Sequence, residues 1–283
     1  REGKPLIQPY NIFSDCFAAM AFSELYKATG DENHKKLALD TFSNIINRQD
    51  NPKGVYTKAY PGTRPLKSFS LPMILCNLSL IMEELLGTEQ VNKTIQPLIH
   101  EVMEVFYDEN SGLILENVTP EGNFSDSFEG RLLNPGHSNE SMWFMMDLAV
   151  RNNDKALIDK CIEILLRTTE KGWDKKHGGI FYFLDLKGHP VQQLEWDQKL
   201  WWVHIETLIS MAKAYRLTGN DACKNWFEII HEYSWKHFKD PEYAEWFGYL
   251  NRQGEPLLEL KGGKWKGCFH VPRGLYEIWK ILE

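Results

Sequence analysis

The sequence predicts an all-α fold, a barrel in which a ring of inner helices is surrounded by outer helices. Three observations support this prediction: helical segments recur along the chain, two kinds of helix alternate, and glycine-containing connections separate the pairs. Self-similarity at a fixed period indicates repeated units that bury one continuous core when they pack together. We therefore interpret the repeating unit as inner helix, turn, outer helix and short β-hairpin.

Five segments that are apolar on most faces are predicted to be inner helices. They begin near Ser14, Leu71, Pro135, Trp201 and Cys268, which is a period of about 65 residues. The first four are expected to end at residues typical of helix C-termini, namely Gly30, Gly87, Asn152 or Asn153, and Gly219.

Amphipathic segments follow the first four inner helices. In one of them Ala222, Trp226, Ile230 and Tyr233 form an apolar stripe with charged residues between them. Such a stripe with a charged back is typical of an outer helix. The predicted outer helices are 32–48, 89–106, 154–170 and 221–238. The connections 111–123, 178–196 and 245–260 each read as a hairpin with a polar turn.

The helix count predicts that residues 1–283 form a single domain that is part of a larger barrel. Five inner and four outer segments are found, whereas a barrel of six pairs needs three more helices. Residues 1–10 are interpreted as the tail of a hairpin. We therefore expect N-terminal helices of the natural protein to precede this chain, which would then supply roughly the C-terminal two thirds of the domain. A complete open arc of five pairs is the alternative.

Composition excludes several classes of function. The chain has 283 residues, 43% hydrophobic, with a net charge of -7 and no basic stripe, so nucleic acid is not an expected partner. No apolar run reaches the length of a membrane span. The five cysteines are isolated, which predicts reduced thiols in the cytoplasm and no metal site or disulfide framework. The 13% aromatic content fits an aromatic-lined sugar cleft and a large core equally well.

Three of the nine histidines fall in the first turn of predicted inner helices, namely His137, His204 and His270. If the inner helices run parallel, their N-termini meet at one end of the barrel and these side chains share one cavity. A single histidine on an apolar helix is usually a core residue with a satisfied partner. Three at equivalent repeat positions favour a functional site instead.

Charged residues lie close to each of these histidines. Glu140 and Arg273 each follow a histidine by three residues and so share its helix face. Glu206 follows a histidine by two residues, so the two side chains diverge and only one of them is expected to face the cavity. Three further charged residues are candidates for the site or are solvated loop charges: Arg131, Glu195 and Lys199.

Five motifs in order make the chain recognisable. They are GRLLNPGH at 130–137, LEW at 194–196, KLWW at 199–202, DPEY and EWFGY within 240–249, and KGCFHVPR at 266–273. With these motifs the sequence resembles the N-acylglucosamine 2-epimerase family, whose vertebrate members are also called renin-binding proteins. The resemblance extends from residue 13 to the last predicted helix.

The resemblance implies an (α/α)6 barrel that interconverts N-acetylglucosamine and N-acetylmannosamine by inverting C2. It implies His137 and His270 as acid and base catalysts, with Glu140, Glu206 and Arg273 matching the remaining family positions. A further family arginine lies on an inner helix upstream of this chain. The resemblance also implies that no cofactor is consumed, that ATP is a possible activator, and that the protein is a homodimer.

Histidine suits this chemistry, because inversion at C2 needs one group to remove a proton from an open-chain sugar and another to return one. The unperturbed pKa of histidine, about 6.5, lies close to working pH. Arg273 is expected to stabilise the enediolate oxygen, and Glu140 to fix the tautomer of His137 or to hold a sugar hydroxyl. Stacking on the sugar is expected from Trp143, Trp201 or Trp202.

Other functions stay open at this point. Related sugar enzymes, such as cellobiose 2-epimerase or mannose isomerase, use the same histidine chemistry. A glycoside hydrolase would use two carboxylates, with Glu140 and Glu206 in those roles, but would leave the histidines unexplained. A non-catalytic binding protein is the last alternative.

Overall fold

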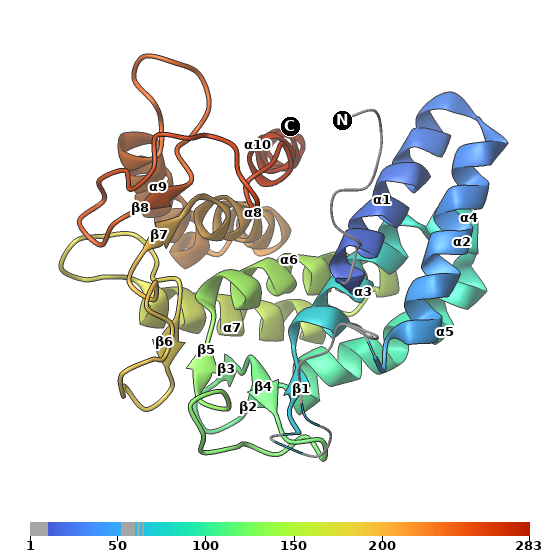
Figure 1. The fold of residues 1–283 in the computed structure, drawn as a ribbon, viewed down its shortest axis with the longest axis horizontal. Helices are drawn as coiled ribbons and strands as arrows, with labels where there is room; N and C mark the ends of the chain where they lie inside the picture. The colour runs from blue at the N-terminus through green and yellow to red at the C-terminus, as the bar shows by residue number, and fades with distance from the viewer. Residues whose placement is uncertain (1–10, 52–59, 61–62, 64) are drawn as a thin grey trace. The chain divides into compact units, whose positions relative to one another are not determined.

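The structure, a computed structural model, describes residues 11–51, 60, 63 and 65–283 (Figure 1). The interpretation of residues 1–10 as a hairpin tail lies outside the described residues. The chain divides into two compact units, Arg1–Val102 and Met103–Glu283. Each unit is described by itself, and the single domain stays a prediction.

The first unit contains two helix pairs. Helix α1 (Ile12–Thr29) packs against α2 (Glu32–Arg48) and α3 (Ser70–Ile81), and α3 packs against α5 (Thr88–His100). A short helix, α4 (Glu83–Leu86), links the last two. Helix α1 ends where its sequence predicts, because Gly30 adopts the left-handed conformation (φ 68°) that glycine tolerates best. The predicted helices 14–30 and 32–48 are thus confirmed within two residues.

The second unit repeats this arrangement with three inner helices. They are α6 (Pro135–Asn152), α8 (Trp201–Thr218) and α10 (His270–Leu282), and both α6 and α10 pack against α8 (Figure 1). The outer helix α7 (Lys155–Gly172) packs on α6, and α9 (Asp221–His237) packs on α8. Every helix predicted in this unit is confirmed within two residues of its expected start.

The three inner helices run parallel, as the contacts at their N-termini show. A Cβ on Gly136, in the first turn of α6, would lie 2.7 Å from the ring of Trp202 in the first turn of α8. One turn further along, the Asn139 side-chain amide donates to Thr207 at 3.0 Å. On the other flank of α8, Gly274 of α10 lies against Ile205. The first turns of α6, α8 and α10 therefore lie together at one end of this unit.

Gly274 is required for the contact between α8 and α10. A Cβ at this position would lie 2.2 Å from Cγ1 of Ile205, far inside van der Waals contact. We expect Gly274→Ala to lower the free energy of unfolding by about 1–3 kcal/mol, since overpacked cores cost this much. Thermal or urea unfolding measures the effect. Gly267→Ala is the control, because a Cβ there meets nothing within 4 Å, and equal losses in both variants would contradict the prediction.

The strands pair differently from the prediction. Among the described residues, β2 and β3 form a local hairpin, and within the predicted hairpin 245–260 Leu250 bridges Pro256 in antiparallel fashion. In contrast, β5 pairs with β6 and β7 with β8, each across an intervening helix pair. The expected self-contained hairpin in 178–196 is therefore wrong. Strands β5 and β7 directly precede α6 and α8, so this pairing fixes where two inner helices begin. The strands are β1 (Lys67–Ser68), β2 (Tyr107–Asp108), β3 (Leu113–Ile114), β4 (Asn117–Val118), β5 (Leu132–Leu133), β6 (Leu184–Asp185), β7 (Lys199–Leu200) and β8 (Tyr249–Leu250).

One other segment departs from a regular α-helix. The predicted outer helix 89–106 is α5 followed by a π-helical turn, Glu101–Val105.

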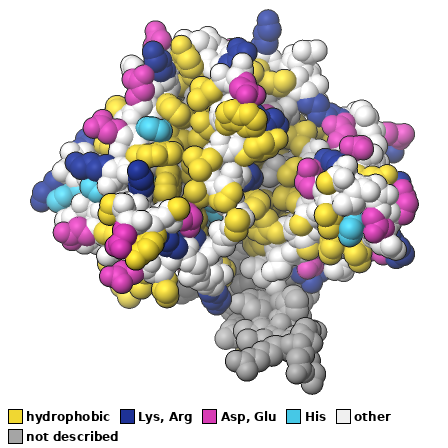
Figure 2. Space-filling model, turned by 90° about the horizontal axis from the view of Figure 1, so that it is seen from above, with side chains coloured by type: hydrophobic (Ala, Val, Ile, Leu, Met, Phe, Trp, Pro, Cys, Tyr) yellow, Lys and Arg dark blue, Asp and Glu magenta, His cyan; other side chains and the backbone are white. Residues whose placement is uncertain are grey.

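No described helix has the length and apolar character needed to cross a membrane. On the face shown in Figure 2, Lys and Arg side chains are interspersed with Asp and Glu.

Candidate active site

His137 is held at the start of α6 by its backbone and its ring. Asn134 caps the helix, because its side-chain oxygen accepts from the His137 backbone N–H at 3.1 Å. The ring Nδ1 lies 3.0 and 3.2 Å from the two carboxylate oxygens of Glu116. Burial alone would lower the pKa of His137, but the Glu116 carboxylate and, more weakly, Glu140 raise it above its ordinary value.

Glu116 is the main residue that the sequence analysis missed. It lies between β3 and β4, and its backbone N–H donates to Leu132 at 3.3 Å. The residue is buried and follows three buried apolar residues in the same connection. A carboxylate within such an apolar run is the one signal in the sequence that marks it as a buried, partnered group.

The second histidine belongs to an ion-pair cluster formed by α8, α10 and α6. Nδ1 of His270 lies 2.6 Å from Oε1 of Glu206, and the indole N–H of Trp143 donates to Oε2 of Glu206 at 3.0 Å. The Arg273 guanidinium bonds Glu206 as well. Burial alone would raise the pKa of Glu206, but Arg273 and His270 hold it well below its usual range. The expected divergence is confirmed: Glu206 meets His270, and His204 does not.

Glu140 contacts a different partner from the one predicted. Its Oε1 accepts from Arg273 at 3.3 Å, whereas the partner of the His137 ring is Glu116. The expectation that Glu140 fixes the tautomer of His137 is therefore wrong. Burial and the neighbouring Glu206 carboxylate raise the pKa of Glu140. Because Arg273 bonds both carboxylates, it holds the two negative charges together in a buried site.

The two imidazoles lie against one aromatic ring. The Trp202 centroid is 5.2 Å from that of His137 and 5.9 Å from that of His270. Trp202 is 8% exposed and comes from the first turn of α8, between the helices that carry the histidines. Trp201 also approaches His270, at 6.3 Å, and Trp143 lies under the Arg273 guanidinium at 5.2 Å. The tryptophans thus form walls of the cluster.

His204 is a structural residue, which corrects the expectation that three histidines share one cavity. It is fully buried, its Nε2 accepts from the backbone N–H of Ile180 at 3.0 Å, and its Nδ1 donates to the carbonyl of Leu200 at 2.8 Å. Its ring stacks on Tyr233 of α9. On a helix, residues two apart point in different directions, so His204 faces the outer helix while Glu206 faces the site.

Burial of this neutral imidazole makes stability depend on pH. The pKa of His204 is lowered to about 3 by burial, whereas the unfolded chain has the ordinary value of 6.5. Between these values the unfolded chain binds the extra proton, so the free energy of unfolding falls as pH drops below about 6.5. We expect this fall to be steeper in the wild type than in His204→Gln, by about 1.4 kcal/mol per pH unit. Urea unfolding at pH 6, 5 and 4 measures it, and parallel curves would contradict it.

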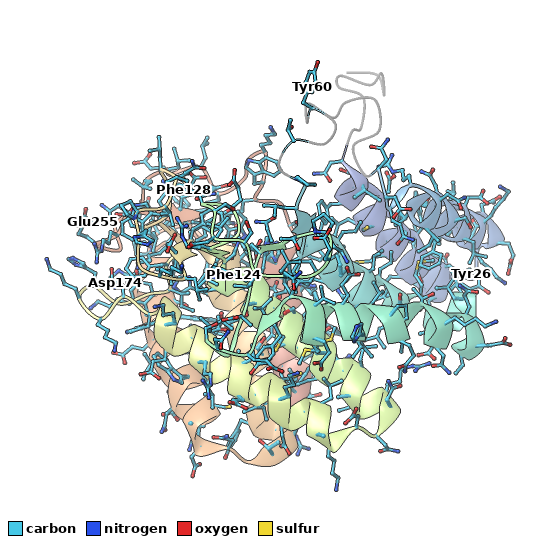
Figure 3. All side chains as sticks on the ribbon, turned by 90° about the horizontal axis from the view of Figure 1, so that it is seen from below. Tyr26, Tyr60, Phe124, Phe128, Asp174 and Glu255 are labelled. Atoms are coloured by element: carbon cyan, nitrogen blue, oxygen red, sulfur yellow. The ribbon has the colours of Figure 1, made fainter. Side chains whose placement is uncertain are left out.

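Three other predicted site residues lie outside the cluster. Lys199 is fully buried, with Nζ 3.3 Å from Asp174 and 3.7 Å from the Phe181 ring centroid, and burial lowers its pKa to about 8. Arg131 bonds Asp126 at 2.8 Å and Asp185 at 2.9 Å. Glu195 is exposed on a turn. Figure 3 shows Asp174 on the connections at one end of the helices. Lys199 and Arg131 hold connecting segments together, and the structure brings none of the three residues into the cluster.

The cluster also has the composition of a metal site. Glu140, Glu206 and His270 have ligand atoms within 4.8 Å of one another, the one such group among the residues that the structure describes. Arg273 bonds both carboxylates at this point. A divalent cation would have to displace the guanidinium, so the group is best explained as an ion-pair network that orients His270.

Comparison with known proteins identifies the family. The family described as N-acylglucosamine 2-epimerase (GlcNAc 2-epimerase) matches residues 1–271. The chain belongs to this family. It is 38% identical over 291 residues to the N-acylglucosamine 2-epimerase of Rattus norvegicus, covering 100% of this chain and 68% of the relative. For the enzyme of Homo sapiens the identity is 35%, covering 97% of this chain and 65% of the relative. The chain thus spans about two thirds of these relatives.

Solved structures of other sugar enzymes share the fold. A D-mannose isomerase has a TM-score of 0.80 at 17% identity, covering 95% of this chain and 72% of the isomerase. The cellobiose 2-epimerase of Bacillus thermoamylovorans B4167 has a TM-score of 0.79 at 19% identity, covering 96% and 71%. These proteins are (α/α)6 barrels, so the predicted fold class is confirmed. The membership in a family of carbohydrate epimerases makes the chain an isomerase.

Proposed function

We propose that this protein interconverts N-acetylglucosamine and N-acetylmannosamine, with His137 and His270 removing and returning the proton at C2. The observation that carries the proposal is the arrangement that the two imidazoles share. Each is held at Nδ1 by a carboxylate, and each lies against Trp202. Hydrogen bonds from described residues reach both rings at Nδ1, so Nε2 is the atom left for proton transfer.

The reaction follows from this arrangement. One imidazole takes the C2 proton of the open-chain sugar, and the C2–H electron pair moves into an enediolate. The other imidazole, already protonated, gives a proton to the opposite face of C2. General acid–base catalysis of this kind contributes about 10²–10⁴-fold per group. Arg273 is the cation of this site, and its buried Nε has no hydrogen-bond partner among the described residues, so it is a donor for the enediolate oxygen.

Two alternatives are less well supported. A glycoside hydrolase needs two carboxylates free to act as acid and base, whereas Glu206 is bound by Trp143, His270 and Arg273. A purely binding protein has no need for two histidines oriented by carboxylates. The family resemblance supports activation by ATP and a homodimer, and the cysteine pattern supports a cytoplasmic location. All three stay predictions.

The test is incubation with N-acetylmannosamine, mannose or cellobiose in D₂O, followed by NMR. We expect N-acetylglucosamine to form from N-acetylmannosamine, with deuterium at C2 and no oxidised product. Turnover of mannose without turnover of the N-acyl sugar would refute the substrate proposed here. Inversion without deuterium uptake would refute the two-histidine mechanism.

A further inference from the structure

We propose that Glu116 is a positioning residue that favours the protonated form of the His137 imidazole and turns the ring so that Nε2 faces the sugar. This inference rests on the proposed epimerase function and adds a residue from a connecting segment to it. Both carboxylate oxygens of Glu116 bond Nδ1 of His137, so in this proposal Glu116 acts through that ring.

The geometry of the pair supports this role. Both carboxylate oxygens of Glu116 approach Nδ1 of His137, at 3.0 and 3.2 Å. The Glu116 side chain is 11% exposed and the His137 side chain 28%, so a buried charge faces a ring that solvent and ligand reach. A buried carboxylate is costly unless it is paired. A carboxylate at Nδ1 also fixes the tautomer in which that nitrogen carries the proton.

The surroundings of His137 leave this pair without a competing cation. Glu140 on the same helix adds a second negative charge that raises the pKa of His137. From α8 the ring meets Trp202, which is uncharged. From the connection before α8, Tyr182 stays a neutral phenol, because burial, Glu195 and Glu116 raise its pKa to about 12. Within the described part of the chain, His137 is the only ion-pair partner of Glu116.

The second carboxylate–histidine pair is built differently. Glu206 bonds His270, but it also bonds Arg273 and the Trp143 indole. Its negative charge is therefore balanced by a permanent guanidinium, whereas that of Glu116 is balanced by a proton on His137. The two histidines are therefore held by carboxylates in different electrostatic surroundings.

The test is Glu116→Gln, which keeps the shape of the side chain and removes its charge. In protein with labelled histidine, we expect the NMR-measured pKa of His137 to fall by about one to three pH units. We expect kcat for the N-acyl sugars to fall about 10–100-fold with KM nearly unchanged, and the acidic limb of the pH–rate profile to move with the pKa. Glu121→Gln is the matched control, because Glu121 is an exposed carboxylate on the same connection.

Two further measurements keep the proposal falsifiable. In the wild type, His137 must titrate above about 6.5 with its neutral form protonated at Nδ1, and Glu116→Asp, which retains the charge, must restore part of kcat. An unchanged pKa of His137 in Glu116→Gln, or a neutral form protonated at Nε2, would overturn the proposal. Because the titration needs no turnover, it separates failure of this inference from failure of the proposed epimerase function.

Discussion

His137→Asn and His270→Asn are each expected to lower kcat for interconversion of the N-acyl sugars by about 10²–10⁴-fold while the protein stays folded. Both rings are partly exposed, so neither substitution opens a cavity in the core. The physical reason is that inversion needs a proton donor and a proton acceptor on opposite faces of C2. Removing either one leaves the enediolate without a route to the other epimer.

Deuterium exchange distinguishes the two histidines. In each single variant one imidazole remains, and it still exchanges the C2 proton of the epimer whose proton faces it. We expect His137→Asn to exchange one N-acyl sugar with D₂O and His270→Asn to exchange the other, each without inversion. NMR of the C2 signals in separate incubations measures this complementary pattern.

The matched control for both variants is His189→Asn, because His189 is exposed on a connection away from the cluster. It should epimerise and exchange both sugars at the wild-type rate. If both active-site variants exchanged the same epimer, the two-histidine mechanism would be wrong. If both kept the wild-type kcat, His137 and His270 would not be the catalytic acid and base.

The sequence predicted those features of the site that local pattern determines. Apolar runs and terminal Gly or Asn residues located α6 and α8, and the parallel packing of inner helices then brought His137 and His270 together. A helical period also predicted that Glu206 and its neighbouring histidine diverge. In each of these cases the relevant residues lie within one helix or at equivalent positions of the repeat.

The remaining features depend on contacts that no local pattern encodes. Glu116 reaches His137 from a connection 21 residues upstream. Its backbone N–H donates to the carbonyl of Leu132, which holds it beside the strand that precedes α6. The position of His204 was predicted correctly on its helix, but only the packing of α9 shows which way it faces. From the sequence, Lys199 could be a solvated loop charge. In the structure it is buried, because it pairs with Asp174, which lies 25 residues upstream.

The other large effect is expected for Glu206→Gln, which should both inactivate and destabilise the protein. Glu206 is fully buried and accepts from three donors, on Trp143, His270 and Arg273. Glutamine offers a single acceptor oxygen, so its amide NH₂ must face at least one of these donors. Removing one member of a buried ion pair costs about 3–5 kcal/mol, because the remaining charge is left uncompensated. We expect a loss of this size in urea unfolding.

Glu140→Gln is the matched comparison, since it removes the other carboxylate from the same guanidinium. Glu140 accepts from Arg273 at 3.3 Å, and its pKa is raised by burial and by Glu206. Neutralising it relieves repulsion between the two carboxylates while Arg273 keeps its shorter bond to Glu206. We therefore expect Glu140→Gln to cost about 1 kcal/mol or less, so that the two variants differ clearly in unfolding midpoint. Equal losses of unfolding free energy would mean that Arg273 interacts equally strongly with Glu140 and Glu206, and that Glu206 is not its main ion-pair partner.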